Sequence, residues 1–257
     1  MPSSAPRAGA AEVYSANVVG YTKVSLTTGL TQFGLQFQDV GAIDGSLSFK
    51  NGIKSSGLMG FDWQGTFAEV DFLSLWDPDS QSYSATYFWS ATDDFSIVGE
   101  ENVWIDTSYI PVNVSLPVGS SLFLNTVSSE ANVIISGEVA IEPVTFELKP
   151  GLTQFSNPYP VAIPLNAIAF SGLTGFDWAG TFAEVDFISV WDPISQAYSF
   201  TYFWSATDDF SIVGSENVWI DTGYTVTDFT IPVGGSVFLF HDGSNSASAT
   251  FTPPNLD

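Results

Sequence analysis

The sequence predicts an all-β protein built from two tandem antiparallel β-sandwich-like modules that sit in a fixed relation. Three observations predict this class. A long segment is repeated, aromatic residues alternate with small polar residues at a period of two, and turn signals recur at short intervals. No segment shows a sustained helical period with caps, so short strands packed as a sandwich fit best, while closure into a barrel stays open.

The repeat sets the domain organisation. Gly60–Thr107 matches Gly175–Thr222 with seven differences over 48 positions. Shorter matches flank this block: Gly29–Phe33 with Gly151–Phe155, and Leu116–Ser120 with Ile231–Gly235. We therefore expect an N-terminal arm at 1–11, copy one at 12–138, and copy two with a C-terminal tail at 139–257. The join at Gly137–Ala140 is too short for a flexible linker, which favours fixed modules and allows a shared strand.

Strands are expected along copy one in order, with equivalents in copy two. The segments are Asn17–Leu26, Phe67–Trp76, Tyr83–Trp89, Val103–Asp106, Ser121–Asn125 and Val133–Ser136. Turns are expected at Asp77–Ser80, Thr92–Asp94 and Pro117–Gly119, which are rich in Asp, Pro, Ser and Gly. Within Tyr83–Trp89, the aromatic side of the strand should face the core, because buried aromatics contribute most there.

Charge and composition exclude several functions. The net charge is −23, from 28 acidic and 5 basic residues. A nucleic-acid reader needs a basic surface, and an anionic membrane would repel this one. No apolar stretch approaches 18 residues, so membrane insertion is not expected. Cysteine is absent and only 13% of residues are charged, which fits a secreted protein at the cell surface or outside the cell.

The segment Glu12–Tyr21 reads Glu-Val-Tyr-Ser-Ala-Asn-Val-Val-Gly-Tyr, and Pro117–Gly119, Leu122–Leu124 and Gly137–Val139 follow it in order. This series resembles a family of secreted β-rich proteins from Planctomycetes–Verrucomicrobia-type bacteria. The likeness covers copy one from end to end and copy two more loosely. It implies export and a β fold, and no particular activity.

No catalytic constellation stands out. His241 is the single histidine, it cannot serve both copies, and no activated-nucleophile motif accompanies it. A glycosidase needs only two carboxylates, but the repeated carboxylates fall among turn signals and strand surfaces, where Asp is expected for turn geometry. We therefore expect a protein that is not an enzyme.

Oxygen ligands could hold calcium, which is the only cofactor that the sequence suggests. The candidate ligands are Asp77, Asp79, Asp93, Asp94, Asp208 and Asp209. The Asp77 run lacks the glycine and distal glutamate of a calcium loop, and Ile194 replaces Asp79 in copy two. Turn carboxylates in water are the simpler interpretation.

Exposed aromatics could contact a glycan. Trp63 and Trp178 each follow Gly-Phe-Asp beside an expected turn, and they are the candidate contacts. The other repeated tryptophans are better explained as core residues.

The leading hypothesis is a non-enzymatic structural subunit of an extracellular bacterial filament, sheath or surface layer, with copies of itself as partners. It would assemble through sheet edges and terminal segments, by strand addition that repeats head to tail. The candidate assembly contacts are Pro2, Ala5, Pro6, Ala8, Val13, Tyr14, Pro253, Pro254 and Leu256. The alternative is a secreted pair of carbohydrate-binding or adhesive modules.

Overall fold

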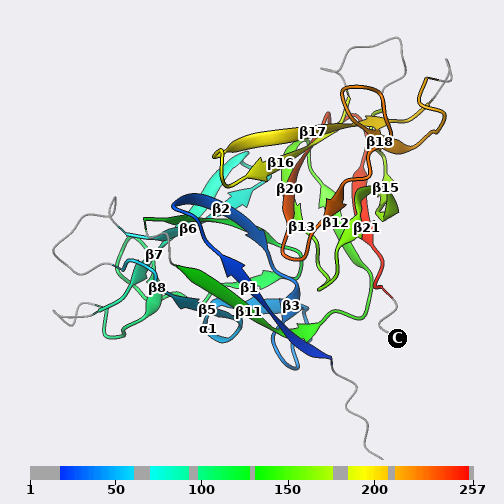
Figure 1. Cartoon of the computed structure of the whole chain (residues 1–257). Coiled ribbons are helices and arrows are strands. Elements are labelled where there is room, and N and C mark those ends of the chain that lie inside the picture. The colour runs from blue at the N-terminus through cyan, green and yellow to red at the C-terminus, as the bar shows by residue number, and fades with distance from the viewer. Residues whose placement is uncertain are drawn as a thin grey trace, which may run out of the picture.

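The computed structural model describes residues 18–60, 70–92, 98–127, 131–175, 185–207 and 212–254. Within these ranges the chain is β almost throughout, and the helical segments are the short α1 (Phe49–Gly52) and the 3-10 turn η2 (Leu165–Ala167). The all-β prediction is confirmed (Figure 1). Among the described residues, neither helical segment has the length or the apolar character needed to span a bilayer.

Residues 18–139, which we call module one, form two main antiparallel sheets. The outer sheet holds β1 (Val19–Ser25), β11 (Asn132–Val139), β3 (Phe37–Gln38) and β5 (Ile53–Ser56). The inner sheet has the order β2 (Gly29–Gly34), β10 (Ser121–Thr126), β6 (Phe72–Asp77), β7 (Ser82–Ser90) and β8 (Val103–Ile105). A small pair joins β4 (Ser46–Ser48) to β9 (Ser115–Pro117).

Residues 144–254, module two, repeat this plan. The outer sheet has the order β12 (Val144–Leu148), β21 (Ala247–Phe251) and β15 (Ala169–Ser171). The inner sheet has the order β13 (Gly151–Ser156), β20 (Ser236–His241), β16 (Phe187–Asp192), β17 (Ala197–Ser205) and β18 (Val218–Ile220). A small pair joins β14 (Ile163–Pro164) to β19 (Thr230–Ile231).

Each module buries its core between its outer and inner sheets. In module one, Phe37 and Ile135 from the outer sheet meet Phe33 and Leu122 from the inner sheet. Module two has an equivalent core, which is centred on the fully buried Phe155 and other apolar side chains of both sheets. The burial of these alternating apolar residues stabilises each pair of sheets, which is the packing of a sandwich.

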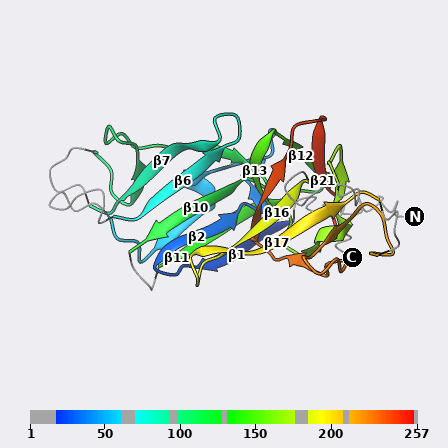
Figure 2. The same cartoon turned by 90° about the horizontal axis from the view of Figure 1, so that it is seen from above.

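The two inner sheets also contact each other, so the order through the molecule is outer sheet one, inner sheet one, inner sheet two, outer sheet two. Figure 1 shows the outer-sheet strands β1 and β11 at the lower end and β12 and β21 in the other half. Figure 2 shows the modules side by side along an elongated molecule. The central strands β10 and β20 are buried on both faces because each lies between its own core and the other module.

Two details differ from the sequence expectation. No strand is shared between the modules in the described chain, because β11 ends at Val139 in one sheet and β12 begins at Val144 in another. The alternation of β7 side chains between the two faces of the sheet is also interrupted. Trp76 is opposite Tyr83 and Leu75 is opposite Ala85, so Ser84 is an extra residue in a bulge. Tyr83 and Tyr87 therefore face opposite sides of the sheet, and Tyr83 does not join the core of its own module.

Candidate functional site

The contact between the modules is made by matched pairs of residues, one from each copy. Gln81, in the turn between β6 and β7, reaches Leu152 of β13. The Leu152 N–H donates to Gln81 Oε1 at 2.7 Å, and Gln81 Nε2 donates to the Leu152 carbonyl at 3.1 Å. Gln196 makes the same two bonds with Leu30 of β2, at 2.7 and 3.0 Å. Because β2 and β13 are edge strands of the inner sheets, each glutamine occupies backbone groups that would otherwise be free.

Tryptophan side chains strengthen the same two points. The Trp76 indole N–H donates to the Leu152 carbonyl at 2.8 Å, and the Trp191 indole N–H donates to the Leu30 carbonyl at 3.1 Å. The Trp76 ring meets Phe238 edge-on at a centroid distance of 5.2 Å, and Trp191 meets Phe123 at the same distance. Such edge-to-face pairs contribute beyond the apolar area that they bury.

Glycine lets the two backbones approach at the centre of this contact. The Gly34 N–H donates to the Gly234 carbonyl at 3.0 Å, and the Ser156 N–H donates to the Gly119 carbonyl at 2.8 Å. A Cβ atom on Gly34 would lie 1.9 Å from the Cβ of Ser156, so position 34 must be glycine for this packing.

The contact has the symmetry of a twofold dimer within one chain. The glutamine, tryptophan and backbone contacts described above are each repeated by their counterparts in the other copy, and some counterparts meet directly. The hydroxyls of Ser121 and Ser236 are hydrogen-bonded, and the rings of Phe123 and Phe238 stack with centroids 6.4 Å apart. This is the isologous arrangement of a twofold interface, and it positions the modules through two matched sets of contacts.

The outer sheet of module one ends in the edge strand β1. The Val139 N–H donates to the Val18 carbonyl at 2.8 Å, and the Leu26 N–H donates to the Ala131 carbonyl at 3.1 Å. In an antiparallel ladder alternate residues bond to the partner strand, so even-numbered residues of β1 face β11. The N–H and C=O groups of the odd-numbered residues, including Tyr21, point to the other side, where no strand is paired in the described chain.

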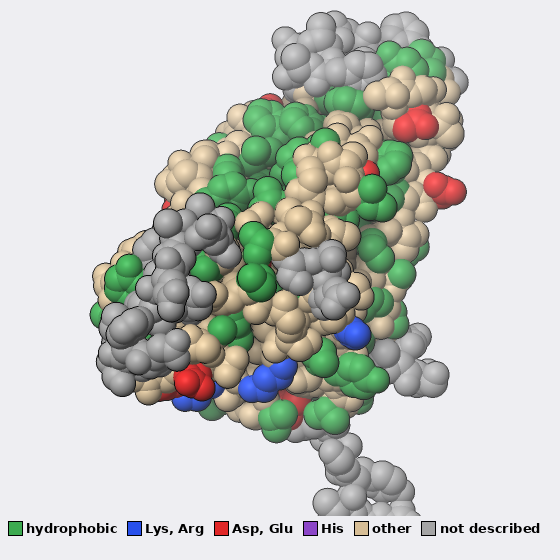
Figure 3. Space-filling view, turned by 60° about the vertical axis from the view of Figure 1, so that its left-hand side comes forward, with side chains coloured by type: hydrophobic (Ala, Val, Ile, Leu, Met, Phe, Trp, Pro, Cys, Tyr) green, Lys and Arg blue, Asp and Glu red, His purple; other side chains and the backbone are tan. Residues whose placement is uncertain are grey.

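The outward face of this sheet combines apolar and basic side chains. Val19 and Tyr21 are 65% and 75% exposed. Lys23 and Lys54 lie opposite Ile134 from its two neighbouring strands, and neither lysine is ion-paired with a described carboxylate. Figure 3 shows basic side chains gathered beside apolar ones at the lower end of the molecule. This face is unusual in a chain with a net charge of −23.

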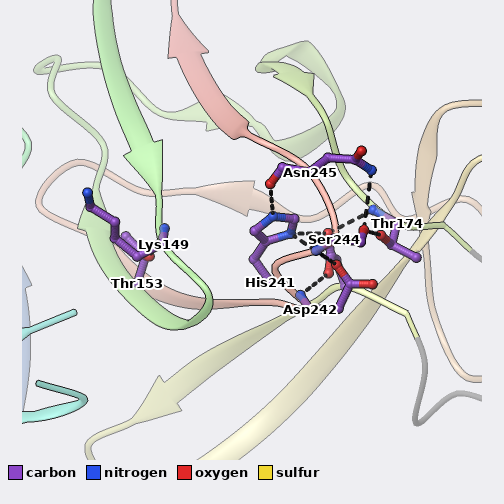
Figure 4. Close-up of polar contacts among 8 residues, drawn as sticks. Lys149, Thr153, Thr174, His241, Asp242, Ser244 and Asn245 are labelled. Atoms are coloured by element: carbon purple, nitrogen blue, oxygen red, sulfur yellow. Dashed lines mark hydrogen bonds and ion pairs between the residues drawn. The ribbon is translucent and has the colours of Figure 1, made fainter. Parts of the chain in front are cut away.

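His241 is a buried structural residue of module two. Its Nδ1 lies 2.8 Å from Asp186 Oδ2, and its Nε2 lies 2.8 Å from the Asn245 carbonyl (Figure 4). Both partners offer oxygen acceptors to the ring nitrogens, which favours the protonated, cationic form of the ring. Burial lowers the pKa of His241, but the bonds to Asn245 and Asp186 and the negative charges of Asp186 and Asp242 outweigh it and raise the pKa.

The same three residues, Asp186, His241 and Asp242, are the group of potential metal ligands that the described residues bring together. Both nitrogens of His241 are used in hydrogen bonds, and Asp186 also accepts the N–H groups of Thr174 and Asp242 at 2.9 and 2.8 Å. A metal would have to replace these bonds. The full burial of His241 and Asp186 also leaves them out of reach of a substrate.

Asp77 organises a turn. Its Oδ1 accepts the Asp79 N–H at 3.0 Å and its Oδ2 accepts the Ser80 hydroxyl at 2.8 Å. The Ser80 bond, followed by the Asp79 bond, lowers the pKa of Asp77. Asp192 makes the same bonds in copy two, where Ile194 stands in place of Asp79. The turn geometry accounts for this repeated carboxylate, and Asp79 itself lies 3.9 Å from Lys149 of module two.

Most of the other predicted site residues fall outside the described residues. These are Pro2, Ala5, Pro6, Ala8, Val13, Tyr14 and Leu256 of the assembly set, Trp63 and Trp178 of the glycan set, and Asp93, Asp94, Asp208 and Asp209 of the calcium set. Pro253 and Pro254 are described; they follow β21 and are half-buried. The assembly contacts at the termini stay a prediction.

No protein-family model, curated protein or solved structure matches this chain. The arrangement of its own residues is therefore the basis for a functional proposal.

Sequence reasoning missed the residues that join the modules. Gln81 and Gln196 recur at equivalent positions and both have positive φ angles, 52° and 53°, which marks them as special turn residues. Glycines 29 and 151, beside them in space, also have positive φ. Recurrence is the one signal that could have singled out these glutamines, but their target on the other module depends on the three-dimensional packing.

Proposed function

We propose that this chain is a non-enzymatic structural subunit of an extracellular filament, sheath or surface layer, in which copies of the chain join through the edges of their outer sheets. One observation carries the proposal. The inner sheets face each other in the contact between the modules, so that the outer sheets turn their outward faces away from that contact. Such a molecule can extend a head-to-tail array.

The free edge of β1 supplies the joining surface. Its outward N–H and C=O groups can pair with an edge strand of a second copy, while Val19 and Tyr21 provide exposed apolar surface beside them. The second edge is β12 of the outer sheet of module two, whose other side is paired with β21. The inner-sheet edges at β2 and β13 are less available, because Gln81 and Gln196 already bind them.

Charge favours a contact between unlike modules. Three of the five basic residues, Lys23, Lys50 and Lys54, lie in module one near its outer sheet, whereas copy two has 13 acidic residues and the single base Lys149. A basic face of one copy against an acidic face of the next reduces the repulsion that a net charge of −23 imposes on assembly. Secretion rests on the composition and on the family resemblance of the N-terminal segment.

The test compares two substitutions at one position of β1. Tyr21→Pro removes an outward N–H and leaves the even-numbered ladder to β11 in place, whereas Tyr21→Thr changes the side chain and keeps the N–H. We expect polymers of the wild-type chain in negative-stain micrographs and in sedimentation velocity, retained by Tyr21→Thr and lost in Tyr21→Pro. Circular dichroism checks that both variants fold.

A wild-type chain that stays monomeric at every salt and calcium concentration would sink the proposal. So would polymers that form equally well with Tyr21→Pro, because they would have to use another surface.

A further inference from the structure

The two modules differ at one open side of the sandwich, between β5 and β8 in module one and between β15 and β18 in module two. In module two, Phe170 of β15 fills this side. Its ring lies 5.1 Å from the ring of Trp219 and 5.9 Å from that of Trp204, measured between centroids. The three aromatic rings close the space between the sheets.

Module one has Ser55 where module two has Phe170. The assignment rests on the repeat and on strand register, since Ser55 lies opposite Val133 of β11, and Phe170 lies opposite Ala249 of β21. The larger Val133 compensates for only a small part of the missing ring. A cavity of 520 Å³ opens here, and its wall includes Trp89 and Trp104, the counterparts of Trp204 and Trp219.

The rim of the cavity carries more charged residues in module one than the equivalent positions carry in module two. Lys54 and Glu100 line it, and copy two has Ala169 and Ser215 at those positions. Lys50, Glu101, Asn102 and Asn113 complete the rim. Cationic donors, carboxylate acceptors and amides therefore surround an aromatic wall. The hydroxyl of Ser55 has no hydrogen-bond partner in the described structure.

We propose that this cavity of module one binds one ring of a saccharide. In module two the equivalent space holds the flat six-membered ring of Phe170. A pyranose ring has a similar thickness and an apolar face that packs on tryptophan. Neighbouring sugar hydroxyls both donate and accept hydrogen bonds, which suits a rim that mixes lysines, carboxylates and asparagines. The balance of lysines and glutamates disfavours a ligand with a strong charge of either sign.

The site does not use the proposed joining edge, because that edge is β1 and the cavity lies at β5, on the other side of β11; Lys50 and Lys54 of its rim also belong to the basic face. Loss of assembly in Tyr21→Pro therefore leaves saccharide binding intact, and loss of binding in Ser55→Phe leaves assembly intact.

The experiment screens the full-length chain on a glycan array and then titrates the best-binding saccharide in solution by saturation-transfer NMR and tryptophan fluorescence. Ser55→Phe places in module one the ring that module two already has, and Ser55→Ala is the matched control that keeps the space open. We expect Ser55→Phe to weaken binding by at least about tenfold and Ser55→Ala to bind within a few-fold of the wild type.

A second pair of substitutions tests the same site at its exposed rim, in case Ser55→Phe disturbs the fold. Lys54→Ala and Glu101→Ala lie at the exposed rim, leave the core unchanged and should each weaken binding. Thermal unfolding of every variant confirms the fold. Benzoate and phenylalanine serve as aromatic probes of the same space.

Three outcomes would overturn the proposal. These are a wild-type chain that binds nothing on the array, saccharide binding that Ser55→Phe leaves unchanged, and binding of the aromatic probes without any saccharide.

Discussion

Equivalent positions of the two copies hold different residue types at one buried site: Thr126 in copy one and His241 in copy two. Both copies bury the neighbouring carboxylate, Asp71 in one and Asp186 in the other, and both carboxylates accept two backbone N–H groups. Burial raises the pKa of Asp71, which has no cationic partner among the described residues. In module two the cationic His241 compensates for the buried charge.

This pair makes the stability of module two depend on pH. The pKa of His241 in the folded protein is above its unfolded value of about 6.5, so its contribution to stability is complete below that pH and is lost as the pH rises through the folded pKa. We expect the urea midpoint of the wild type to fall as the pH rises above about 6.5.

The variant His241→Thr installs the copy-one residue and isolates this effect. It removes one partner of a buried pair, which costs about 3 kcal/mol at pH 6. The difference between wild type and variant should then shrink as the pH rises, because the wild type alone loses its cation. Parallel curves for the two proteins would show that His241 does not titrate in this range.

At the scale of strands and turns, sequence periodicity predicted the existence of most elements. The strands expected at Asn17–Leu26, Tyr83–Trp89 and Ser121–Asn125 correspond to β1, β7 and β10. Period two did not reveal on which side each aromatic lies, because the extra residue Ser84 reverses the alternation. A bulge of this kind leaves no clear mark in the residue pattern.

The joining residues were harder to predict than the strands. Trp76 and Phe123 read as ordinary core aromatics, because a sequence shows that a residue is apolar and does not show which of two apolar surfaces it meets. The hydrogen bonds of Gln81 are harder still to predict, since its partner Leu152 is 71 positions away in the sequence and belongs to the other copy.

The two glutamines give a matched prediction. Gln81→Ala and Gln196→Ala each leave the backbone N–H of Leu152 or Leu30 without its side-chain partner, while the carbonyl keeps the tryptophan indole N–H. Each variant should cost about 1–3 kcal/mol of unfolding free energy. Because the contacts repeat, the two costs should agree within about 0.5 kcal/mol. Urea unfolding of the single variants and of the double variant measures them. A large difference between the two would mean that the modules meet asymmetrically.

Over the whole molecule, the shared contact couples the two cores. Since Trp76 and Trp191 both pack across it, the wild-type chain should unfold in one calorimetric transition. The double variant Trp76→Ala/Trp191→Ala removes both rings and should separate this transition into two, one for each module. Two transitions already present in the wild type would contradict the coupling.

The packing of Gly34 against Ser156 has a consequence for which modules can pair. These two residues are each other's counterparts, and there is room for a side chain on one of them only. Two second modules from different chains would bring serine against serine, in a gap too narrow for both. Exchange of partners between neighbouring molecules during folding is thereby restricted, although the two modules share a nearly identical block of 48 residues. The four-residue tether between β11 and β12 also favours the partner on the same chain.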